Sequence, residues 1–286
     1  MKKITVILSF IQIVLVSMPV LSAEIEKKEE IQKTFHFSDP RGKKQVIVDN
    51  VFGSITVVGI KGETLQLIVH KTIYAKSEKK AEEATEEVRL EIKEKNNLIE
   101  FFVDGPFRTR SGSINCRGWR YYGYKVSHDF ELKVPFETDL SLKTVNEGEI
   151  LVRKVQGKYD IENINGGIEM QDIGGSGRVY ALNGDVEVVF KENPNNDSYF
   201  GSLNGEIKLY LRSPLSADFR LKTFNGDVYS DYPVLYLSPR PFTKVKKSGK
   251  TVYKCDPTFG VRSGDGGPEI ELDAFNGDTY ILKRTK

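Results

Sequence analysis

Apolar and polar residues alternate along most of this chain, and one short phrase interrupts the alternation at regular intervals. The phrase is an apolar residue, Asn-Gly, an acidic residue and another apolar residue, as in residues 182–186. Its asparagines, spaced by 19, 18, 21, 21 and 51 residues, are Asn146, Asn165, Asn183, Asn204, Asn225 and Asn276. Alternation with a period of two is typical of β-strands. Self-similarity at a near-fixed spacing is typical of a repeat architecture.

Two geometries suit these corners. Gly supplies the positive φ that a sharp turn needs, and Asn is the next most tolerant residue there. A two-residue hairpin is the strongest short-range interpretation of Asn-Gly, and it would give an antiparallel meander or a sandwich. A solenoid corner would instead stack units of about 20 residues, with the asparagine side chains in a ladder. The near-constant period favours an all-β, β-solenoid or β-helix-like repeat, with the meander or sandwich as the alternative.

The first 23 residues have the layout of a secretory signal peptide. Lys2 and Lys3 precede an apolar run over 4–16, and residues 19–23 suit a signal peptidase. The run is too short for a convincing membrane span, and an uncleaved anchor is the alternative. We therefore expect an exported protein of the periplasm, the cell envelope or the extracellular space, with no transmembrane segment in the mature chain.

The remainder is predicted to be a charged leader followed by a single β-repeat domain. The segments are a flexible leader over 24–43 and the domain over 44–286, which comprises an irregular N-terminal part (44–104), repeats (124–230 and 266–283) and an insertion with a hairpin (231–265). One segment of the N-terminal part departs from the strand pattern. Ala81, Ala84 and Val88 recur at helical spacing, so a short surface helix is expected over 77–87, capped by Ser77.

The charge balance of the chain narrows the range of expected partners. The chain has 42 Lys and Arg against 40 Asp and Glu, and two of the lysines precede residue 24. The mature chain would be neutral, whereas nucleic-acid binding needs a net basic footprint, so no nucleic-acid partner is expected.

Cys116 and Cys255 are the only cysteines. Because an exported chain meets oxidising conditions, a disulfide between them is predicted, with two free thiols as the alternative.

The layout of the domain resembles a known family. The carrying residues are a strand ending in Val-Pro (130–135), Leu142-Lys143-Thr144-Val145-Asn146, the Asn-Gly corners and a closing segment over 264–272. Together with the charged helix and the returning hairpin before them, they resemble, over residues 44–283, a β-helical, adhesin-like family of exported or envelope bacterial proteins of unknown function. The resemblance implies a solenoid and supplies no catalytic residue. An extra residue, Glu147, and the stretch 231–265 depart from the family pattern.

Sequence motifs for catalysis and metal binding are missing. His36, His70 and His128 lack a zinc-binding spacing and are expected to be strand histidines with satisfied hydrogen bonds. The acidic corner residues would align along one edge, where stacked oxygens offer a weak calcium site: Glu149, Asp185, Glu206, Asp227 and Asp278. They recur as a corner requirement does, whereas an active site breaks a repeat. We therefore expect a structural role for them, no metal and no cofactor.

Two stretches break the repeat and are candidates for recognition. One holds aromatic and arginine side chains of the kind that bind glycans, anionic polymers or proteins: Phe107, Arg108, Arg110, Arg117, Trp119, Arg120, Tyr121 and Tyr122. An ordinary edge strand is the alternative interpretation. The predicted disulfide would bring the second stretch, 231–265, beside the first.

The sequence thus predicts a non-enzymatic, exported β-repeat protein that serves as an adhesin-like binding module or an envelope scaffold, with an unknown envelope protein or glycan as partner. Two other classes stay open. One is a polysaccharide-active β-helix enzyme, since such enzymes gather carboxylates on one face. The other is a sensory or regulatory envelope module.

Overall fold

The computed structural model describes residues 24–39, 41–109, 114, 122–237, 243–247, 250–254 and 258–285. The predicted signal peptide lies outside these ranges. Strands dominate the described residues, with one helix among them, which confirms the all-β class. No helix in this part of the chain is both long and apolar enough to cross a membrane.

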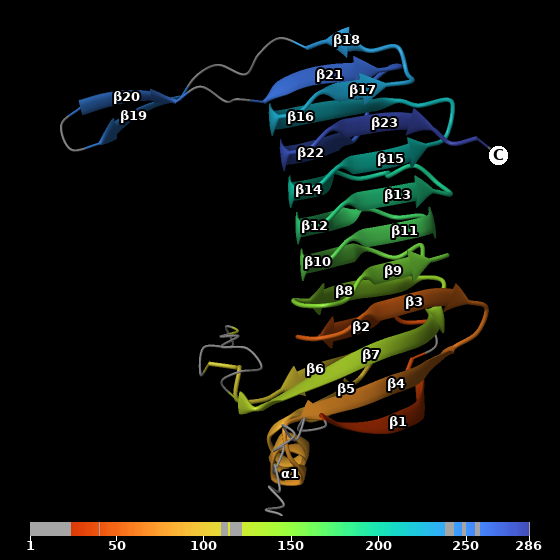
Figure 1. Cartoon of the computed structure of the whole chain (residues 1–286). Coiled ribbons are helices and arrows are strands. Elements are labelled where there is room, and N and C mark those ends of the chain that lie inside the picture. Colours follow the sequence, from red (N-terminus) through yellow and green to blue (C-terminus); the bar gives the residue numbers. More distant parts are fainter. Residues whose placement is uncertain are drawn as a thin grey trace, which may run out of the picture.

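The strands form two mixed sheets, which face each other across one hydrophobic core, and a separate hairpin (Figure 1). Sheet A contains, in spatial order, β1 (Ile25–His36), β4 (Thr64–Ala75), β7 (Tyr124–Pro135), β3 (Ile55–Ile60), β9 (Ile150–Arg153), β11 (Ile168–Ile173), β13 (Val186–Phe190), β15 (Ile207–Leu211), β23 (Thr279–Lys283) and β17 (Val228–Ser230). Sheet B contains β18 (Leu235–Tyr236), β21 (Phe259–Ser263), β16 (Ala217–Asn225), β22 (Glu269–Asn276), β14 (Ser198–Asn204), β12 (Gly177–Asn183), β10 (Tyr159–Asn165), β8 (Thr138–Thr144), β2 (Lys44–Asp49), β6 (Leu98–Asp104) and β5 (Arg89–Lys95). The hairpin is β19 (Thr243–Lys247) with β20 (Lys250–Lys254).

From β8 to β17 the chain passes back and forth between the sheets, and each strand pairs in parallel with its equivalent in the next layer. The alternation of buried and exposed side chains along each strand fixes this pairing of two sheets. Val179 and Ala181 of β12 face Val186 and Val188 of β13 in the core, and all four are fully buried. The strands on either side of an Asn-Gly corner therefore lie in different sheets. The corners are not two-residue hairpins, and the repeats are not an antiparallel meander. Two sheets joined in this way combine features of a solenoid and of a sandwich.

The corner asparagines form the predicted ladder. Each side-chain amide donates to the side-chain oxygen of the asparagine one layer away, at 2.7–2.8 Å, along the series Asn225, Asn276, Asn204, Asn183, Asn165 and Asn146. The asparagines in the ladder follow the spatial order of the layers, which differs from their order in the sequence at the end that contains Asn225 and Asn276. Asn276 lies between Asn204 and Asn225, because β22 and β23 insert between the two layers that precede them in the chain.

The corner glycines are needed for a reason other than the one the sequence suggested. Of Gly166, Gly184, Gly205, Gly226 and Gly277, only Gly277 has a positive φ. A Cβ atom on any of the five would instead lie 2.1–2.3 Å from the carbonyl oxygen of the glycine in the neighbouring layer. Close stacking therefore excludes other residues at all five corners, and only at Gly277 does the backbone conformation add to it.

The column of corner glycines is longer than the set of repeats seen in the sequence. Gly148 continues it, and a Cβ atom on Gly148 would lie 2.1 Å from the carbonyl oxygen of Gly53. Gly53 follows β2, and the next strand, β3, lies in sheet A. The corner before β3 therefore belongs to the same glycine column, although this corner does not contain the Asn-Gly phrase.

An antiparallel part closes the N-terminal end of the stack. The helix α1 (Glu78–Glu87) covers it through Ala81 and Ala84, and the side chain of Ser77 accepts from the backbone N–H of Lys80, as the cap predicted. The predicted flexible leader differs from the structure, because residues 25–36 form β1. This strand pairs with β4 along all 12 of its residues and buries Phe35, and these contacts order a segment whose composition is mostly charged.

The predicted insertion builds the opposite end. Here β18 pairs antiparallel with β21, and β21 pairs antiparallel with β16. Sheet B therefore extends two strands beyond β16, whereas sheet A ends at β17 (Figure 1).

The glycine column generates a stability prediction. Gly184→Ala should lower the free energy of unfolding by about 1–3 kcal/mol, the usual cost of overpacking, because its Cβ atom would lie 2.3 Å from the carbonyl oxygen of Gly166. Gly167→Ala is the matched control in the neighbouring corner, since the nearest atom to its Cβ is 3.4 Å away. Urea unfolding of both variants measures the difference. Equal stabilities would show that stacking does not select the corner glycines.

Candidate functional site

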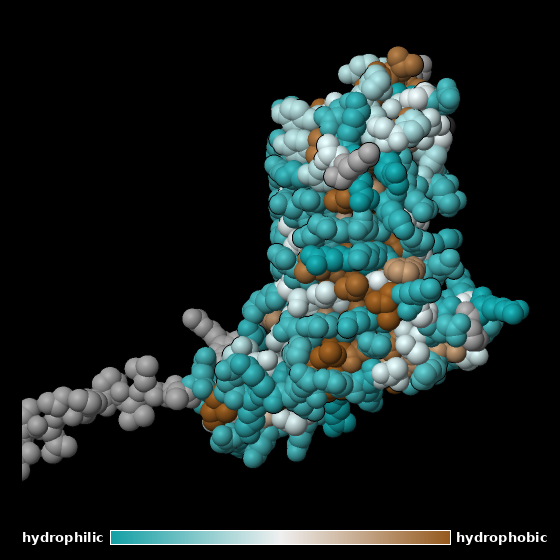
Figure 2. All heavy atoms as spheres, turned by 90° about the vertical axis from the view of Figure 1, so that its right-hand side faces the viewer, coloured by the Kyte–Doolittle hydropathy of each residue, from teal (hydrophilic) through white to brown (hydrophobic). Residues whose placement is uncertain are grey.

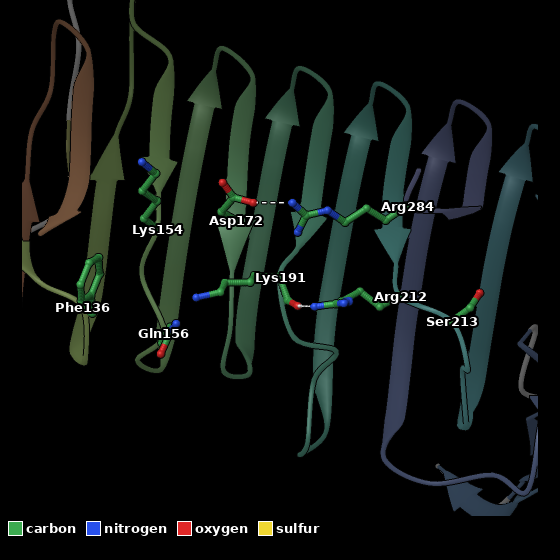
Figure 3. Close-up of a pocket in the computed structure, with 8 residues that line it drawn as sticks. All are labelled: Phe136, Lys154, Gln156, Asp172, Lys191, Arg212, Ser213 and Arg284. Carbon is green, nitrogen blue, oxygen red and sulfur yellow. Dashed lines mark hydrogen bonds and ion pairs between the residues drawn. The ribbon is translucent and has the colours of Figure 1, made fainter. Parts of the chain in front are cut away.

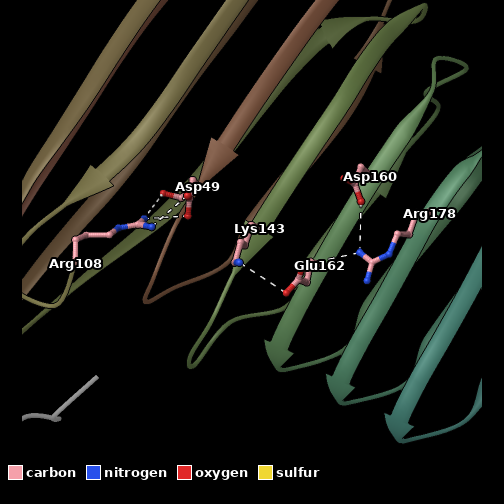
Figure 4. Close-up of polar contacts among 6 residues, drawn as sticks. All are labelled: Asp49, Arg108, Lys143, Asp160, Glu162 and Arg178. Atoms are coloured by element: carbon pink, nitrogen blue, oxygen red, sulfur yellow. Dashed lines mark hydrogen bonds and ion pairs between the residues drawn. The ribbon is translucent and has the colours of Figure 1, made fainter. Parts of the chain in front are cut away.

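Two members of the predicted aromatic and arginine surface are occupied by contacts within the protein. Phe107 is buried and packs edge-on against Phe52, with ring centroids 6.5 Å apart. Arg108 donates both terminal nitrogens to the carboxylate of Asp49, at 3.1 and 2.9 Å, and its guanidinium lies over the ring of Phe102 at 4.3 Å (Figure 4). Its side chain is 5% exposed. Both residues therefore stabilise the fold and are not free for a ligand.

Tyr122, the third described member of this surface, is half-buried. Its ring lies 5.8 Å from that of Tyr124, and its hydroxyl donates to the carbonyl oxygen of Pro106 at 3.3 Å. The other members, Arg110, Arg117, Trp119, Arg120 and Tyr121, lie outside the described residues, as do Cys116 and Cys255. The composite surface and the disulfide stay predictions.

The acidic corner residues make contacts between layers. The carboxylate of Asp185 accepts the backbone N–H of Glu206, and that of Asp278 accepts the backbone N–H of Asp227, both at 2.8 Å. Glu206 forms an ion pair with Lys208. Within the described ranges, no group of three His, Cys, Asp or Glu residues is arranged to hold a metal ion.

The histidines are dispersed, and one differs from expectation. His128 is fully buried, and neither ring nitrogen has a hydrogen-bond partner in the described part of the chain. Burial, together with the nearby positive charge of Lys71, lowers the pKa of His128 to about 3. Its imidazole is therefore neutral at physiological pH and serves as part of the core.

The outer face of sheet B carries ion pairs that run between layers. Arg178 approaches Asp160 at 3.5 Å and Glu162 at 3.8 Å, and Lys143 approaches Glu162 at 3.7 Å (Figure 4). These side chains are substantially exposed, so each pair contributes only about 0–1 kcal/mol to stability. Opposite charges alternate here, and the face offers no concentration of one sign.

A concentration of positive charge does occur at another edge, where the strands of sheet A end. This side of the stack faces the viewer in Figure 2, and hydrophilic side chains predominate along it. A hollow of about 660 Å³ opens there (Figure 3), lined by Phe136, Lys154, Gln156, Asp172, Lys191, Arg212, Ser213 and Arg284. We call it the basic hollow. It lies at the ends of β9, β11, β13, β15 and β23, which are neighbours in sheet A.

Backbone contacts fix the two arginines of the basic hollow. Arg212 donates to the carbonyl oxygen of Lys191 at 3.1 Å. Arg284 donates to the carbonyl oxygen of Phe190 at 2.8 Å and pairs with the carboxylate of Asp172 at 2.6 Å (Figure 3). Asp172 is the only carboxylate in the described lining, against four cationic side chains. The hollow therefore has a net positive charge and suits an anion.

The two lysines have ammonium groups that no described residue engages. The backbone holds Lys154 in place at the end of β9. It has a left-handed conformation, with φ of 59°, and its N–H donates to the carbonyl oxygen of Gln171 at 2.8 Å. A Cβ atom on Gly59 would lie 1.9 Å from the carbonyl oxygen of Lys154, so glycine is needed there for the close approach.

Sequence reasoning missed the basic hollow, although the repeat contains its signal. Lys191, Arg212 and Arg284 each lie eight residues after a corner asparagine, namely Asn183, Asn204 and Asn276. Lys154 is also eight residues after Asn146, but it lies one position earlier in its layer, because that corner contains the extra residue Glu147 and Ile150 aligns with Ile168 and Val186. Because the layers stack in register, a constant offset from the corner brings these side chains to one edge. The signal is a repeated offset of charge, which a search for contiguous motifs does not detect.

Comparisons with known proteins give only distant similarities. No protein-family model and no curated protein matches the chain. One similar solved structure is a "putative cell adhesion protein" from Clostridium sporogenes, with 11% identity, coverage of 90% of this chain and 100% of that one, and a TM-score of 0.40. Two others, from Parabacteroides distasonis, are a "putative lipid binding protein" (10% identity, 89% and 97% coverage, TM-score 0.28) and a "putative adhesin" (9% identity, 89% and 97% coverage, TM-score 0.23). Two of the three are thus named for adhesion, but likenesses this low do not assign a function.

The buried histidine generates a pH prediction. The unfolded chain binds a proton at His128 below pH about 6.5, whereas the folded protein resists protonation down to about 3, so stability falls as the pH drops through this range. Between pH 7 and pH 5, the protein should lose about 2 kcal/mol more than the His128→Leu variant, whose side chain does not titrate. Urea unfolding at the two pH values measures this. Parallel losses in the two proteins would contradict a buried neutral imidazole.

The contacts of the acidic corner residues generate a prediction about calcium. A ligand that binds only the folded protein would stabilise it by about 2.7 kcal/mol at 100 times its dissociation constant. Because the carboxylates of Asp185 and Asp278 already accept backbone hydrogen bonds, we expect an unchanged melting temperature from zero to millimolar Ca²⁺. Magnesium at the same ionic strength is the control. A rise specific to Ca²⁺ that Asp185→Asn abolishes would identify the corners as a calcium site.

Proposed function

We propose that this protein is an exported, non-enzymatic binding module of the adhesin type, built as a β-solenoid, and that it binds an anionic envelope polymer along the basic hollow. The observation that carries the proposal is the meeting of four cationic side chains from four layers at one open hollow, with a single carboxylate among them. The two unengaged lysines supply charge that a ligand can neutralise.

The spacing of the cationic groups favours an extended ligand. Neighbouring strands in a sheet lie about 4.8 Å apart, so side chains from β9 to β23 are spread along the edge of the stack. A small anion would contact only one or two of them. A linear polymer with a phosphate or carboxylate on successive units would contact all of them and would follow the edge from layer to layer.

The remaining lining residues suit a glycan. Phe136 is 37% exposed at one end of the hollow and offers an apolar ring face for a sugar. Gln156 and Ser213 offer an amide and a hydroxyl for hydrogen bonds to sugar hydroxyl groups. An acidic or phosphate-bearing polysaccharide combines the features that this lining complements.

The distribution of carboxylates supports binding over hydrolysis. Glycoside hydrolysis generally uses two carboxyl groups on either side of the scissile bond. The described lining of the basic hollow offers one, Asp172, which is paired with Arg284. In the corner row, Asp185 and Asp278 accept backbone hydrogen bonds from the adjacent layer.

The proposal is tested by calorimetric titration of the purified protein with poly(glycerol phosphate) and with polygalacturonate. Lys154→Ala/Lys191→Ala should weaken binding by roughly tenfold, because exposed ion pairs contribute about 0.2–1 kcal/mol each and 1.4 kcal/mol corresponds to a factor of ten. Binding should also weaken at raised salt, which screens exposed charges.

The matched control is Lys61→Ala/Lys79→Ala, which removes the same charge from two exposed lysines outside the hollow. It should bind as the unmodified protein does. Equal weakening in both double variants would show a nonspecific charge effect and would contradict the site. Release of shorter polymer fragments during the titration would favour the enzyme alternative.

A further inference from the structure

One layer of the stack is incomplete at the end that lies opposite α1. In each layer of the repeats one strand belongs to sheet B and the other to sheet A, as in β22 with β23 and β16 with β17. Beyond β16, sheet B continues with β21 and β18, whereas no described strand of sheet A lies beyond β17 (Figure 1). The layer of β21 therefore has its strand in sheet B and an open position in sheet A.

The inner face of β21 and β18 is exposed because this position is open. Direct cross-strand partners share one face of a sheet, and Phe259 of β21 pairs with Leu221 of β16 on the core face. Leu221 is 2% exposed, whereas Phe259 is 38% exposed. Tyr236 of β18, which pairs with Val261 on the same face, is 83% exposed. These aromatic rings face the place where a further strand of sheet A would lie.

A second hollow, of about 310 Å³, occupies part of this open position. Its lining includes Val228 of β17, Ile281 of β23, and the inward-facing Phe259, Val261 and Tyr236. Because a water molecule in the liquid takes about 30 Å³, the hollow has room for roughly ten heavy atoms, the size of about two or three aliphatic side chains. We call this open position, together with the hollow, the sheet A recess.

The edge of β17 offers backbone groups to an added strand. In the described part of the chain, β17 pairs with β23 alone. The N–H of Thr279 donates to the carbonyl oxygen of Asp227 at 2.9 Å, so the backbone carbonyl of Asp227 faces β23. Because backbone groups point to alternate sides along a strand, the N–H and C=O groups of Val228 and Ser230 face the recess. Such an edge can accept a further strand, which is one of the recurring ways in which proteins bind extended peptides.

The outer face of the same edge indicates which side chain would fit there. Lys208 of β15, Tyr280 of β23 and Tyr229 of β17 are successive members of one cross-strand row. The ammonium of Lys208 lies over the ring of Tyr280 at 5.4 Å, and the rings of Tyr280 and Tyr229 are stacked with their centroids 5.0 Å apart. Tyr229 is 46% exposed, and no described strand of sheet A follows it. The face of the Tyr229 ring that points away from Tyr280 is therefore open.

Nearby carboxylates make this open ring face attractive for a cation. The negative charges of Asp227 and Asp278 raise the pKa of Tyr229, and Asp227 also lines the hollow. A lysine or arginine is attracted to the negative face of an aromatic ring. An added strand with a basic side chain opposite Tyr229 would interact with both the ring and the carboxylates, in the position that Lys208 has over Tyr280.

We propose that the sheet A recess binds an extended segment of a partner polypeptide, which pairs with β17 and carries a lysine or arginine between two apolar residues. The basic side chain covers Tyr229 on the outer face, and the two apolar side chains enter the hollow against Phe259 and Val261. A second copy paired antiparallel through its own β17 would bring its β21 and β18 onto those of the first copy, whereas a single extended segment meets no such obstacle. The interaction does not depend on the proposed polymer binding, which the Lys154→Ala/Lys191→Ala variant tests separately.

The chain itself supplies a probe with the required sequence. Residues 205–212 read Gly-Glu-Ile-Lys-Leu-Tyr-Leu-Arg. Within the fold, Lys208 lies opposite Tyr280 between two inward-facing apolar residues, which is the arrangement proposed opposite Tyr229. A fluorescently labelled synthetic peptide of this sequence should bind the purified protein saturably, with a dissociation constant below about 1 mM, because small interfaces give weak complexes. Fluorescence anisotropy measures the affinity.

Two peptides of equal composition test the register of the pairing. In the fold, the N–H of Ile207 donates to the carbonyl oxygen of Asp278 in the layer that follows, so the backbone of Leu209 faces that way too and the backbone of Tyr210 faces the preceding layer. On β17, the peptide N–H at Tyr210 would therefore face the protein. Methylation of this nitrogen should weaken binding roughly tenfold, whereas methylation at Leu209 should leave it unchanged. Similar affinities for the two methylated peptides would contradict pairing with β17.

Protein variants test the recess from the other side. Tyr236→Glu places a carboxylate among the inward-facing apolar side chains and should weaken binding of the unmodified peptide roughly tenfold. Phe224→Glu is the matched control, because Phe224 is also an exposed aromatic residue near this end but lies on the outer face of sheet B. It should bind the peptide as the unmodified protein does. A folded Tyr236→Glu protein with unchanged affinity would overturn the proposal.

Hydrogen exchange locates the peptide without any variant. The amides of Val228 and Ser230 should exchange rapidly in the free protein and slowly when the peptide is bound, because the peptide would accept hydrogen bonds from them. The proposal is overturned if the peptide does not bind saturably or if its binding leaves these two amides unprotected. Slow exchange of both amides in the free protein would also overturn it, since the edge of β17 would then already be occupied.

Discussion

The structure depends on keeping successive layers in register at the spacing of hydrogen-bonded strands. Parallel pairing sets that spacing, and side chains at the corners must tolerate it. The glycines of the corners stack with so little room that a Cβ atom would meet the next carbonyl oxygen at 2.1–2.3 Å. The asparagines beside them convert the same proximity into a chain of hydrogen bonds. The corner glycines and asparagines that hold two layers together therefore also fix the register of the other side chains in those layers.

Register also explains how the basic hollow arises. A side chain at a constant offset from the corner occupies the same place in each layer, so a charge repeated at that offset becomes a row. Lys191, Arg212 and Arg284 lie in three adjacent layers and Lys154 lies two layers away from Lys191, so the row is a consequence of the register of the fold. A ligand with regularly repeated anionic groups can contact several members of such a row at once. An extended polymer therefore fits better than a small anion.

The regular part of the fold could be predicted from the sequence, because each layer repeats the same local chemistry. The strand alternation, the asparagine ladder and the short helix after Ser77 all follow from short windows of residues. The corner geometry did not follow, since Asn-Gly suits both a hairpin and a link between sheets, and only the partner strands decide between them. Arg108 was missed as a structural residue because its partner, Asp49, is 59 residues away. The order of the final layers could not be predicted from short windows of sequence either, because β22 and β23 could join the stack at its end or between two earlier layers.

The position of that last strand pair has a consequence for how the molecule is assembled. β22 and β23 follow every other described strand in the chain, yet they fill the space between β14–β15 and β16–β17. The layer containing β16 and β17 therefore cannot reach its final place when it emerges, because its neighbour has not yet been synthesised. Growth of the stack by simple addition of layers in sequence order therefore ends at β15, and the layer of β16 and β17 is completed only after β22 and β23 have been made. A chain cut short before β22 would lose an internal layer, and with it the support for everything above.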